Sequence, residues 1–267
     1  MDPGELKNLV TVAVPAYNMC QFLAEALESL LAQTYPHFEA LVIDDGSIDC
    51  TPEVAARYLP GGERFDPRVV YIRQANQGKV AALNNAIARA RGEFFAILDA
   101  DDTWPPQSLE ARVRALAREP GLVAVYGDAN YMDEQGRVYR VRRSRPVKRQ
   151  EELIGSVLVP IIGTTILARV PAMRDMLPLD TSYTRTDDAF INVELYQRGR
   201  LRHVPEIVLN YRNYRRAKNP WLRIVSTYHL CRLIARHYRG PVRWYYQAKQ
   251  IIICGLKLAY EIIFFYK

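Results

Sequence analysis

Short apolar runs alternate with amphipathic segments over the first hundred residues. The runs have the length and composition of buried strands and cover residues 9–14, 40–43, 69–72 and 94–98. The segments between them show helical spacing or helix-start residues, at residues 21–33, from 51 onwards and at 79–91. Strands that alternate with helices predict an α/β domain, with a parallel sheet and helices on both of its faces.

Polar loops follow each of these strands, at residues 15–18, 44–47, 76–79 and 99–102. Because ligands of such sheets bind outside the carboxyl ends of the strands, we expect the four loops to gather at one edge. Tyr17 offers a ring for stacking on a base, Asp45 can accept from a pyrimidine imide N–H, and Gly78 allows close approach to a ribose. Taken singly, these residues also suit a rim aromatic, a turn and a loop glycine.

Three carboxylates, Asp99, Asp101 and Asp102, end the fourth strand. Like charges this close repel by about 1 kcal/mol per pair even at high effective dielectric, and a bound cation would relieve the repulsion. Mg²⁺ and Mn²⁺ take such oxygen ligands, with substrate phosphates completing the shell. The cluster therefore indicates a divalent metal and a phosphorylated ligand. The alternative is that Asp101 or Asp102 caps the helix that starts near Pro105.

Four motifs occupy these loops and their flanks. They are Val14-Pro15-Ala16-Tyr17-Asn18, Ile43-Asp44-Asp45-Gly46-Ser47-Ile48-Asp49, Asn76-Gln77-Gly78 with Ala81-Ala82-Leu83-Asn84, and Leu98-Asp99-Ala100-Asp101-Asp102. As a set, in this order and spacing, they resemble the inverting family 2 glycosyltransferases of GT-A fold. The resemblance covers about residues 8–215. It implies a Rossmann-like mixed sheet flanked by helices, and a nucleotide-diphosphate sugar as donor.

The resemblance also implies the site residues. The nucleotide sugar would contact Pro15, Ala16, Tyr17, Asn18, Asp45, Gly78, Lys79, Asp99, Ala100 and Asp101. Asp101 would be the main metal ligand, with Asp99 near the ribose and Asp102 auxiliary. Thr186-Asp187-Asp188 matches the acidic motif of the catalytic helix, which assigns Asp188 as the general base. The structural alternative is that Asp187 and Asp188 only favour a helix N-terminus.

Two positions depart from the family pattern. The usual Arg before the Asn of the third motif is Leu83, which removes a possible phosphate or carboxylate contact. The usual Arg six residues after the catalytic acid is Glu194, so we expect different packing or charge around that helix. Neither change touches the residues assigned to the metal or the base.

Charge is distributed unevenly along the 267 residues. The net charge of +7 combines −5 over residues 1–199 with +12 over residues 200–267, where 14 Lys or Arg face two acids. Seven bases without an acid also lie between Arg137 and Arg149. That run suits a solvated surface or the binding of an anionic acceptor or donor diphosphate. The basic end predicts contact with an anionic surface.

The C-terminal part, residues 219–267, is predicted to be a helical extension of a catalytic domain at 1–218. Segments 221–238 and 251–266 combine apolar residues, Trp and Tyr with flanking bases, which is typical of a helix at a membrane interface. The alternative is that these helices cover the catalytic domain or form a homodimer contact. No apolar stretch reaches the roughly 18 residues of a membrane span, and no signal peptide is indicated.

The cysteine spacing and the motifs together indicate the class of protein and its compartment. Cys20, Cys50, Cys231 and Cys254 lack C-x-x-C spacing, so neither a zinc site nor a disulfide framework is indicated, and a reducing compartment fits best. We therefore expect a cytoplasmic enzyme, peripheral at the inner face of the membrane, that needs Mn²⁺ or Mg²⁺. It would transfer a sugar to a saccharide or lipid-linked acceptor in cell-surface polysaccharide or glycolipid synthesis. The expected donor is a UDP-sugar, because Asp45 can accept the imide N–H of uracil. Nucleic acid is not an expected partner. The alternatives are a polyprenyl-phosphate glycosyltransferase and a non-catalytic sugar-nucleotide binding module.

Overall fold

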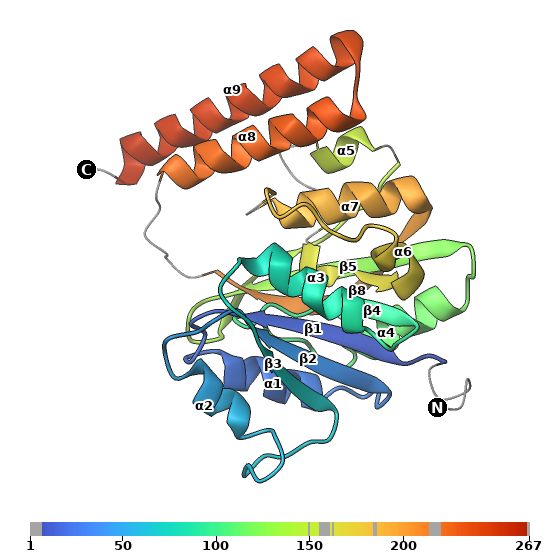
Figure 1. Cartoon of the computed structure of the whole chain (residues 1–267). Coiled ribbons are helices and arrows are strands. Elements are labelled where there is room, and N and C mark those ends of the chain that lie inside the picture. Colours follow the sequence, from blue (N-terminus) through green and yellow to red (C-terminus); the bar gives the residue numbers. More distant parts are fainter. Residues whose placement is uncertain are drawn as a thin grey trace.

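One mixed sheet organises the computed structural model, which describes residues 7–148, 150–154, 161, 163–183, 186–213 and 220–265 (Figure 1). Within these residues the sheet has eight strands, in the order β3–β2–β1–β4–β7–β5–β6, with β8 also paired to β5. The strands are β1 (Val10–Ala16), β2 (Phe38–Asp44), β3 (Val69–Arg73), β4 (Phe94–Ile97), β5 (Leu122–Met132), β6 (Val138–Arg142), β7 (Leu167–Arg169) and β8 (Arg200–Arg212).

The first half of the sheet is parallel, as the alternation of strands and helices predicts. β1 pairs in parallel with both β2 and β4, and β2 with β3. The second half is mixed, because β7 runs antiparallel to β4 and β5, and β6 antiparallel to β5, whereas β8 is parallel to β5. The mixed GT-A sheet implied by the resemblance is therefore confirmed.

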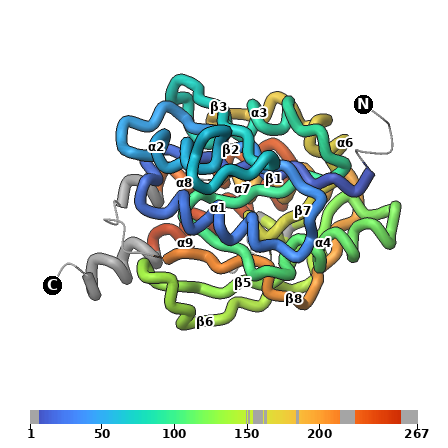
Figure 2. Tube along the Cα trace, turned by 90° about the horizontal axis from the view of Figure 1, so that it is seen from below, coloured from blue at the N-terminus to red at the C-terminus, as the bar shows by residue number. Residues whose placement is uncertain are grey.

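Helices cover both faces of the sheet. They are α1 (Leu23–Leu31), α2 (Thr51–Ala56), α3 (Lys79–Arg89), α4 (Ser108–Ala117), α5 (Glu151–Ile154), α6 (Val170–Arg174), α7 (Asp187–Arg198), α8 (Pro220–His237) and α9 (Gly240–Phe265), with a 3₁₀ turn at Gly163–Thr165. The apolar residues of α1 and α4 form a core on the face seen in Figure 2, and those of α3, α6 and α7 form a second core on the opposite face. The sheet and its loops are thus held from both sides.

The predicted helical extension is present as a hairpin of α8 and α9 above α7 (Figure 1). Leu233 and Ile234 of α8 are buried in the same core as the apolar residues of α7. The side chain of Gln197 on α7 contacts His237 at 2.6 Å, and Arg232 donates to the Ser182 hydroxyl at 2.9 Å. α8 therefore packs on α7 and the core beneath it, and α9 packs on α8. The predicted domain boundary at residues 218 and 219 lies outside the described residues.

None of the described helices has a stretch that is both long and apolar enough to cross a bilayer. The side chains of residues 256–265 and the whole of residues 266–267 lie outside what the structure describes, so the predicted apolar segment at 262–266 is not placed.

Candidate active site

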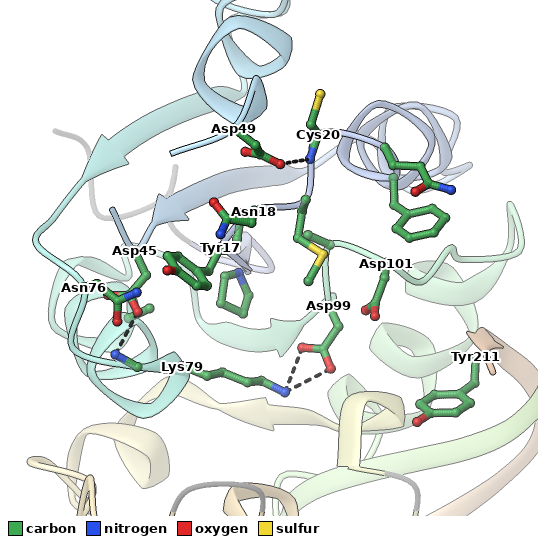
Figure 3. Close-up of a pocket in the computed structure, with 18 residues that line it drawn as sticks. Tyr17, Asn18, Cys20, Asp45, Asp49, Asn76, Lys79, Asp99, Asp101 and Tyr211 are labelled. Atoms are coloured by element: carbon green, nitrogen blue, oxygen red, sulfur yellow. Dashed lines mark hydrogen bonds and ion pairs between the residues drawn. The ribbon is translucent and has the colours of Figure 1, made fainter. Parts of the chain in front are cut away.

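The four loops that follow the parallel strands meet at one pocket of about 900 Å³ (Figure 3). Its lining includes ten residues predicted from sequence, namely Pro15, Ala16, Tyr17, Asn18, Asp45, Gly78, Lys79, Asp99, Ala100 and Asp101. The predicted convergence of these loops at the carboxyl edge of the sheet is therefore present in the structure.

One end of the pocket has the groups expected around a nucleotide base. Tyr17 is 42% exposed and lies at the pocket rim, beside Asn18 and Asp45 in Figure 3. Asn18 adopts a left-handed backbone with φ of 53°, which Asn tolerates better than most residues. Its N–H donates to the Ser47 hydroxyl at 3.0 Å and its side-chain oxygen accepts from the Ile48 N–H at 2.9 Å. These bonds join the loop after β1 to the loop after β2.

Asp45 holds the third loop in place. Its carboxylate accepts from the backbone N–H groups of Gln77 at 2.9 Å and Gly78 at 2.7 Å, and from the Gln74 side-chain amide at 2.8 Å. Gly78 needs its glycine because its φ is 89°, a region that other residues rarely adopt. A carboxylate offers about four lone-pair sites, so Asp45 retains room for one further donor at the pocket.

A disulfide between Cys20 and Cys50, 5.1 Å apart at their Cα atoms, is a further link between the first two loops. The cysteine spacing in the sequence did not indicate this bond. The two cysteines are 30 residues apart in sequence, and only the alignment of β1 with β2 brings them together. The Cys20 N–H also donates to Asp49 at 3.1 Å, and both residues line the pocket.

The carboxylates of Asp99, Asp101 and Asp102 form a compact cluster, with one oxygen of each within 4.8 Å of the others. Asp102 is buried, and its Oδ1 accepts the Arg212 N–H at 2.8 Å. Among the described residues, its Oδ2 has no hydrogen-bond partner. Burial, followed by the charges of Asp99 and Asp101, holds the pKa of Asp102 well above its usual range. Three hard oxygen donors and an unsatisfied buried oxygen fit a divalent cation such as Mg²⁺ or Mn²⁺.

Arg212 fixes the turn that presents this cluster. Its guanidinium donates to the Asp101 carbonyl at 2.7 Å, to the Glu134 carbonyl at 2.7 Å and to the Glu25 carboxylate at 2.6 Å. It also lies 4.8 Å from the centre of the Phe22 ring and is buried. Sequence analysis missed this residue, because it lies on β8, 110 residues beyond Asp102.

Lys79 connects the cluster with the acids of α7. Its ammonium lies 2.8 Å from one oxygen of Asp99 and 2.9 Å from the other, and 3.2 Å from Asp187 (Figure 3 shows the contacts with Asp99). Burial lowers the pKa of Lys79, but the carboxylates of Asp187, Asp99 and Asp188 outweigh it and raise the pKa well above its ordinary value. Lys79 therefore stays charged and offsets part of the negative charge of the site.

Asp188, the predicted base, lies in the first turn of α7 directly after Asp187. Burial, followed by the charge of Asp187, raises the pKa of Asp188 to about 7, although Lys79 opposes the shift. Asp188 does not line the main pocket; it borders a small neighbouring cavity with Phe95, Ala96 and Ile191. A carboxyl group with this pKa exchanges protons near neutral pH, as a general base must. Its role as the base stays a prediction.

Tyr211 is the other pocket residue that sequence analysis missed. It lies on β8 beside Asp101 in Figure 3. Burial and then the charges of Asp102, Asp101 and Asp99 raise the pKa of its hydroxyl, so it stays protonated. Two signals were present in the sequence, a short apolar run at residues 207–209 and the Tyr-Arg pair at 211–212, but neither reveals which loops β8 adjoins.

The two departures from the family pattern have structural consequences. Leu83 is fully buried in the core of α3, so this position contributes no charge to the pocket. Glu194 is buried on α7, pairs with Arg198 at 2.8 Å and lies 3.9 Å from Arg236 and 3.5 Å from His237 of α8. The changed charge on α7 therefore faces the C-terminal hairpin.

A family model described as glycosyl transferase family 2 matches residues 11–177, more than half of the chain and including three of the loops and the carboxylate cluster. The chain belongs to this family. The resemblance drawn from the four motifs is thereby confirmed.

Curated relatives of the family match parts of the chain. The putative teichuronic acid biosynthesis glycosyltransferase TuaG of Bacillus subtilis is 38% identical over 109 residues, covering 40% of this chain and 41% of TuaG. The chondroitin synthase of Escherichia coli is 29% identical over 150 residues, covering 56% of this chain and 21% of the synthase. In both cases the match spans less than half of the relative's own length.

Solved structures share the fold over nearly the whole chain. S. aureus TarS 1-349 in complex with UDP has a TM-score of 0.61 and 19% identity, over 96% of this chain and 72% of that one. The mannosyltransferase PcManGT from Pyrobaculum calidifontis, in complex with GDP-Man and Mn²⁺, has a TM-score of 0.63 and 22% identity, over 94% and 75%. At these identities the likeness establishes the GT-A fold.

Proposed function

We propose that this chain is a metal-dependent inverting glycosyltransferase that moves a sugar from a UDP-sugar to a hydroxyl group of an acceptor. The observation that carries the proposal is that Lys79 lies between Asp99 of the carboxylate cluster and Asp187, the residue before Asp188 on α7. Family membership and the nucleotide complexes of the structural relatives support a nucleotide-sugar donor. The names of TuaG and chondroitin synthase support a role in cell-surface polysaccharide synthesis.

In the proposed reaction the acceptor hydroxyl attacks the anomeric carbon from the side opposite the diphosphate. Asp188 takes the hydroxyl proton as the new C–O bond forms, and UDP leaves with the electrons of the broken anomeric C–O bond, so the configuration inverts. A divalent ion held by Asp99, Asp101 and Asp102 would offset the charge on the leaving diphosphate. Lys79 would keep the base and the cluster from repelling each other.

The uracil preference rests on Tyr17 and Asp45. The ring of Tyr17 offers a stacking face, and the remaining lone pairs of Asp45 suit a single imide N–H. Calorimetry with UDP and GDP tests the preference, and tighter binding of GDP would contradict it.

The base is tested by Asp188→Asn, with the exposed Asp175→Asn as the matched control. For a hydroxyl acceptor we expect Asp188→Asn to lower turnover by about 10²- to 10⁴-fold, the range for general-base catalysis, and Asp175→Asn to leave it unchanged. A small loss in Asp188→Asn would instead indicate an acceptor that is already ionised, as in the polyprenyl-phosphate alternative. A chain that binds UDP-sugars but never turns them over would be the non-catalytic module.

The outer face of α9 supports a peripheral membrane location as part of this proposal. Over residues 241–255, the part of α9 whose side chains the structure describes, the exposed positions are apolar and recur at helical spacing, at Pro241, Val242, Trp244, Tyr245, Ala248, Ile251, Ile252 and Gly255. Trp244 is 67% exposed and Ile251 61%, and the bases Arg243 and Lys249 border the stripe. An apolar stripe with Trp, Tyr and flanking bases suits the headgroup region of a bilayer.

Charge favours an anionic bilayer over a second copy of the chain. The sequence between Glu206 and Glu261 has eleven Lys or Arg and no acid. In a two-fold symmetric dimer through this stripe, the basic borders would face each other without acidic partners. On an anionic leaflet the same bases would each contribute about 1 kcal/mol to binding.

A further inference from the structure

Three tyrosines on neighbouring strands form a row that starts at the active-site pocket. Tyr211 of β8 lines the pocket, and the ring of Tyr131 on β5 lies 5.4 Å from it, centre to centre. The ring of Tyr139 on β6 follows at 6.4 Å from Tyr131. Tyr131 and Tyr211 are direct partners in the β5–β8 register. The row therefore leads from the carboxylate cluster towards the edge of the sheet.

The row is not part of the protein core. None of the three tyrosines belongs to either apolar cluster of the described residues, and Tyr139 is 56% exposed. Polar partners nevertheless fix two of the rings, because Arg142 donates to the Tyr131 hydroxyl at 3.1 Å and Asn213 to the Tyr139 hydroxyl at 2.7 Å. Exposed aromatic rings held in a fixed row are a feature of binding surfaces.

The chemistry of the row fits a saccharide. Sugar rings present C–H faces that stack on aromatic rings, while their hydroxyls stay free for polar groups at the ring edges. The two centre-to-centre spacings are each comparable to the length of one sugar unit in a linear chain. A saccharide lying on the row would place one end beside Tyr211, at the pocket that holds the donor in the proposed function.

The charge around the row points to an anionic saccharide. Arg137 and Arg140 are exposed, and Arg142 lies against the Tyr131 hydroxyl. Two acids lie next to this run. Asp133 accepts the backbone N–H groups of Gln135 and Arg137, at 3.0 and 2.8 Å, and Glu134 accepts from the Gln21 side-chain amide at 3.4 Å. Guanidinium groups bind carboxylates and phosphates in a bidentate manner.

We propose that Tyr211, Tyr131 and Tyr139 form an acceptor subsite for a saccharide that carries carboxylate or phosphate groups, which Arg140 and Arg142 bind. This inference rests on the proposed glycosyltransferase function and names the acceptor class. It also gives the basic run at residues 137–149 a role other than solvation of the surface.

Calorimetry at low salt with three probes tests the subsite. The probes are trigalacturonate, maltotriose carrying one phosphate, and plain maltotriose, and they distinguish the carboxylate, phosphate and neutral classes. The variants are Tyr139→Ala and Arg140→Gln, with the exposed Tyr228→Ala and Arg118→Gln as matched controls elsewhere on the surface. We expect at least one anionic probe to bind more tightly than maltotriose, and its Kd to rise roughly five- to tenfold in Tyr139→Ala and Arg140→Gln only.

The inference is overturned if no anionic probe binds better than maltotriose, or if Tyr139→Ala and Arg140→Gln bind like the controls. Release of UDP from a UDP-sugar without acceptor is measured in parallel on the same proteins. This release rate should not change in the controls Tyr228→Ala and Arg118→Gln, because neither residue lines the pocket. If the wild-type chain binds an anionic probe but releases no nucleotide from any donor, the proposed function fails and the saccharide site stands.

Discussion

Replacing Lys79 with methionine should move the pH dependence of the reaction upwards. In the proposed reaction Asp188 acts as a base only when ionised, so the rate should rise as the pH passes its pKa of about 7. Lys79, 2.8 Å from Asp99 and 3.2 Å from Asp187, is the cation that holds this pKa down. A nearby opposite charge typically lowers a carboxyl pKa by roughly 1 to 3 units, so its loss should move Asp188 to roughly 8 or above.

The expected loss of activity in Lys79→Met follows from the ionised fraction of Asp188 at each pH. With a pKa of about 7, about half of Asp188 is ionised at pH 7, whereas with a pKa of roughly 8 only about one tenth is. The variant should therefore lose roughly fivefold in kcat/KM at pH 7 from this cause and recover most of that loss near pH 9.

The assay is the initial rate of nucleotide release from the donor, with water as acceptor, between about pH 5.5 and 9.5. Lys79→Arg keeps the positive charge and is the matched control, with an inflection close to that of the wild type. Because Lys79 also lines the donor pocket, the readout is the position of the inflection and not the amplitude. An unchanged or lower inflection in Lys79→Met would refute the electrostatic role assigned to Lys79.

Three further outcomes are expected. Asp188→Asn should raise the melting temperature of the metal-free protein at pH 8, and the gain should shrink as the pH falls from 7 towards 4. The sign follows because burial raises the pKa of Asp188 to about 7, so its stabilising protonated form is lost as the pH rises through that value; an equal gain at all pH values would contradict it. Arg212→Met should lower the free energy of unfolding by roughly 1–3 kcal/mol in urea titrations, because it leaves the carbonyls of Asp101 and Glu134 without their buried guanidinium donor. Exposed Arg137→Met should change little, and similar values for both would be the contrary result. Trp244→Ser combined with Ile251→Ser should abolish salt-sensitive flotation with anionic liposomes while donor hydrolysis persists, and unaltered flotation would exclude this face of α9 as the contact.

The parallel half of the fold was predictable because its signals are local. Each of the first four strands is a short apolar run that ends in polar residues, and the resulting loops meet where parallel strands must bring them. The ten predicted site residues line one pocket for that reason.

The second half of the fold was less predictable because its pairing is long-range. β6 was interpreted only as a basic run, since its exposed edge position leaves no buried apolar pattern at Val138–Arg142. β8 returns to pair with β5 after an intervening helix, and this pairing brings Tyr211 and Arg212 to the carboxylates. The disulfide of Cys20 and Cys50 was not predicted for the same reason, because spacing along the chain does not show which loops lie next to each other.

The central claim is tested most directly by nucleotide release from UDP-sugars with and without a divalent metal, in the wild type and in Asp101→Ala. The matched control is Asp175→Ala, an exposed acid away from the pocket. We expect release in Mn²⁺ or Mg²⁺, loss of that release in EDTA with recovery on adding metal back, and a loss of similar size in Asp101→Ala at all metal concentrations. Activity that survives both EDTA and Asp101→Ala would contradict the account.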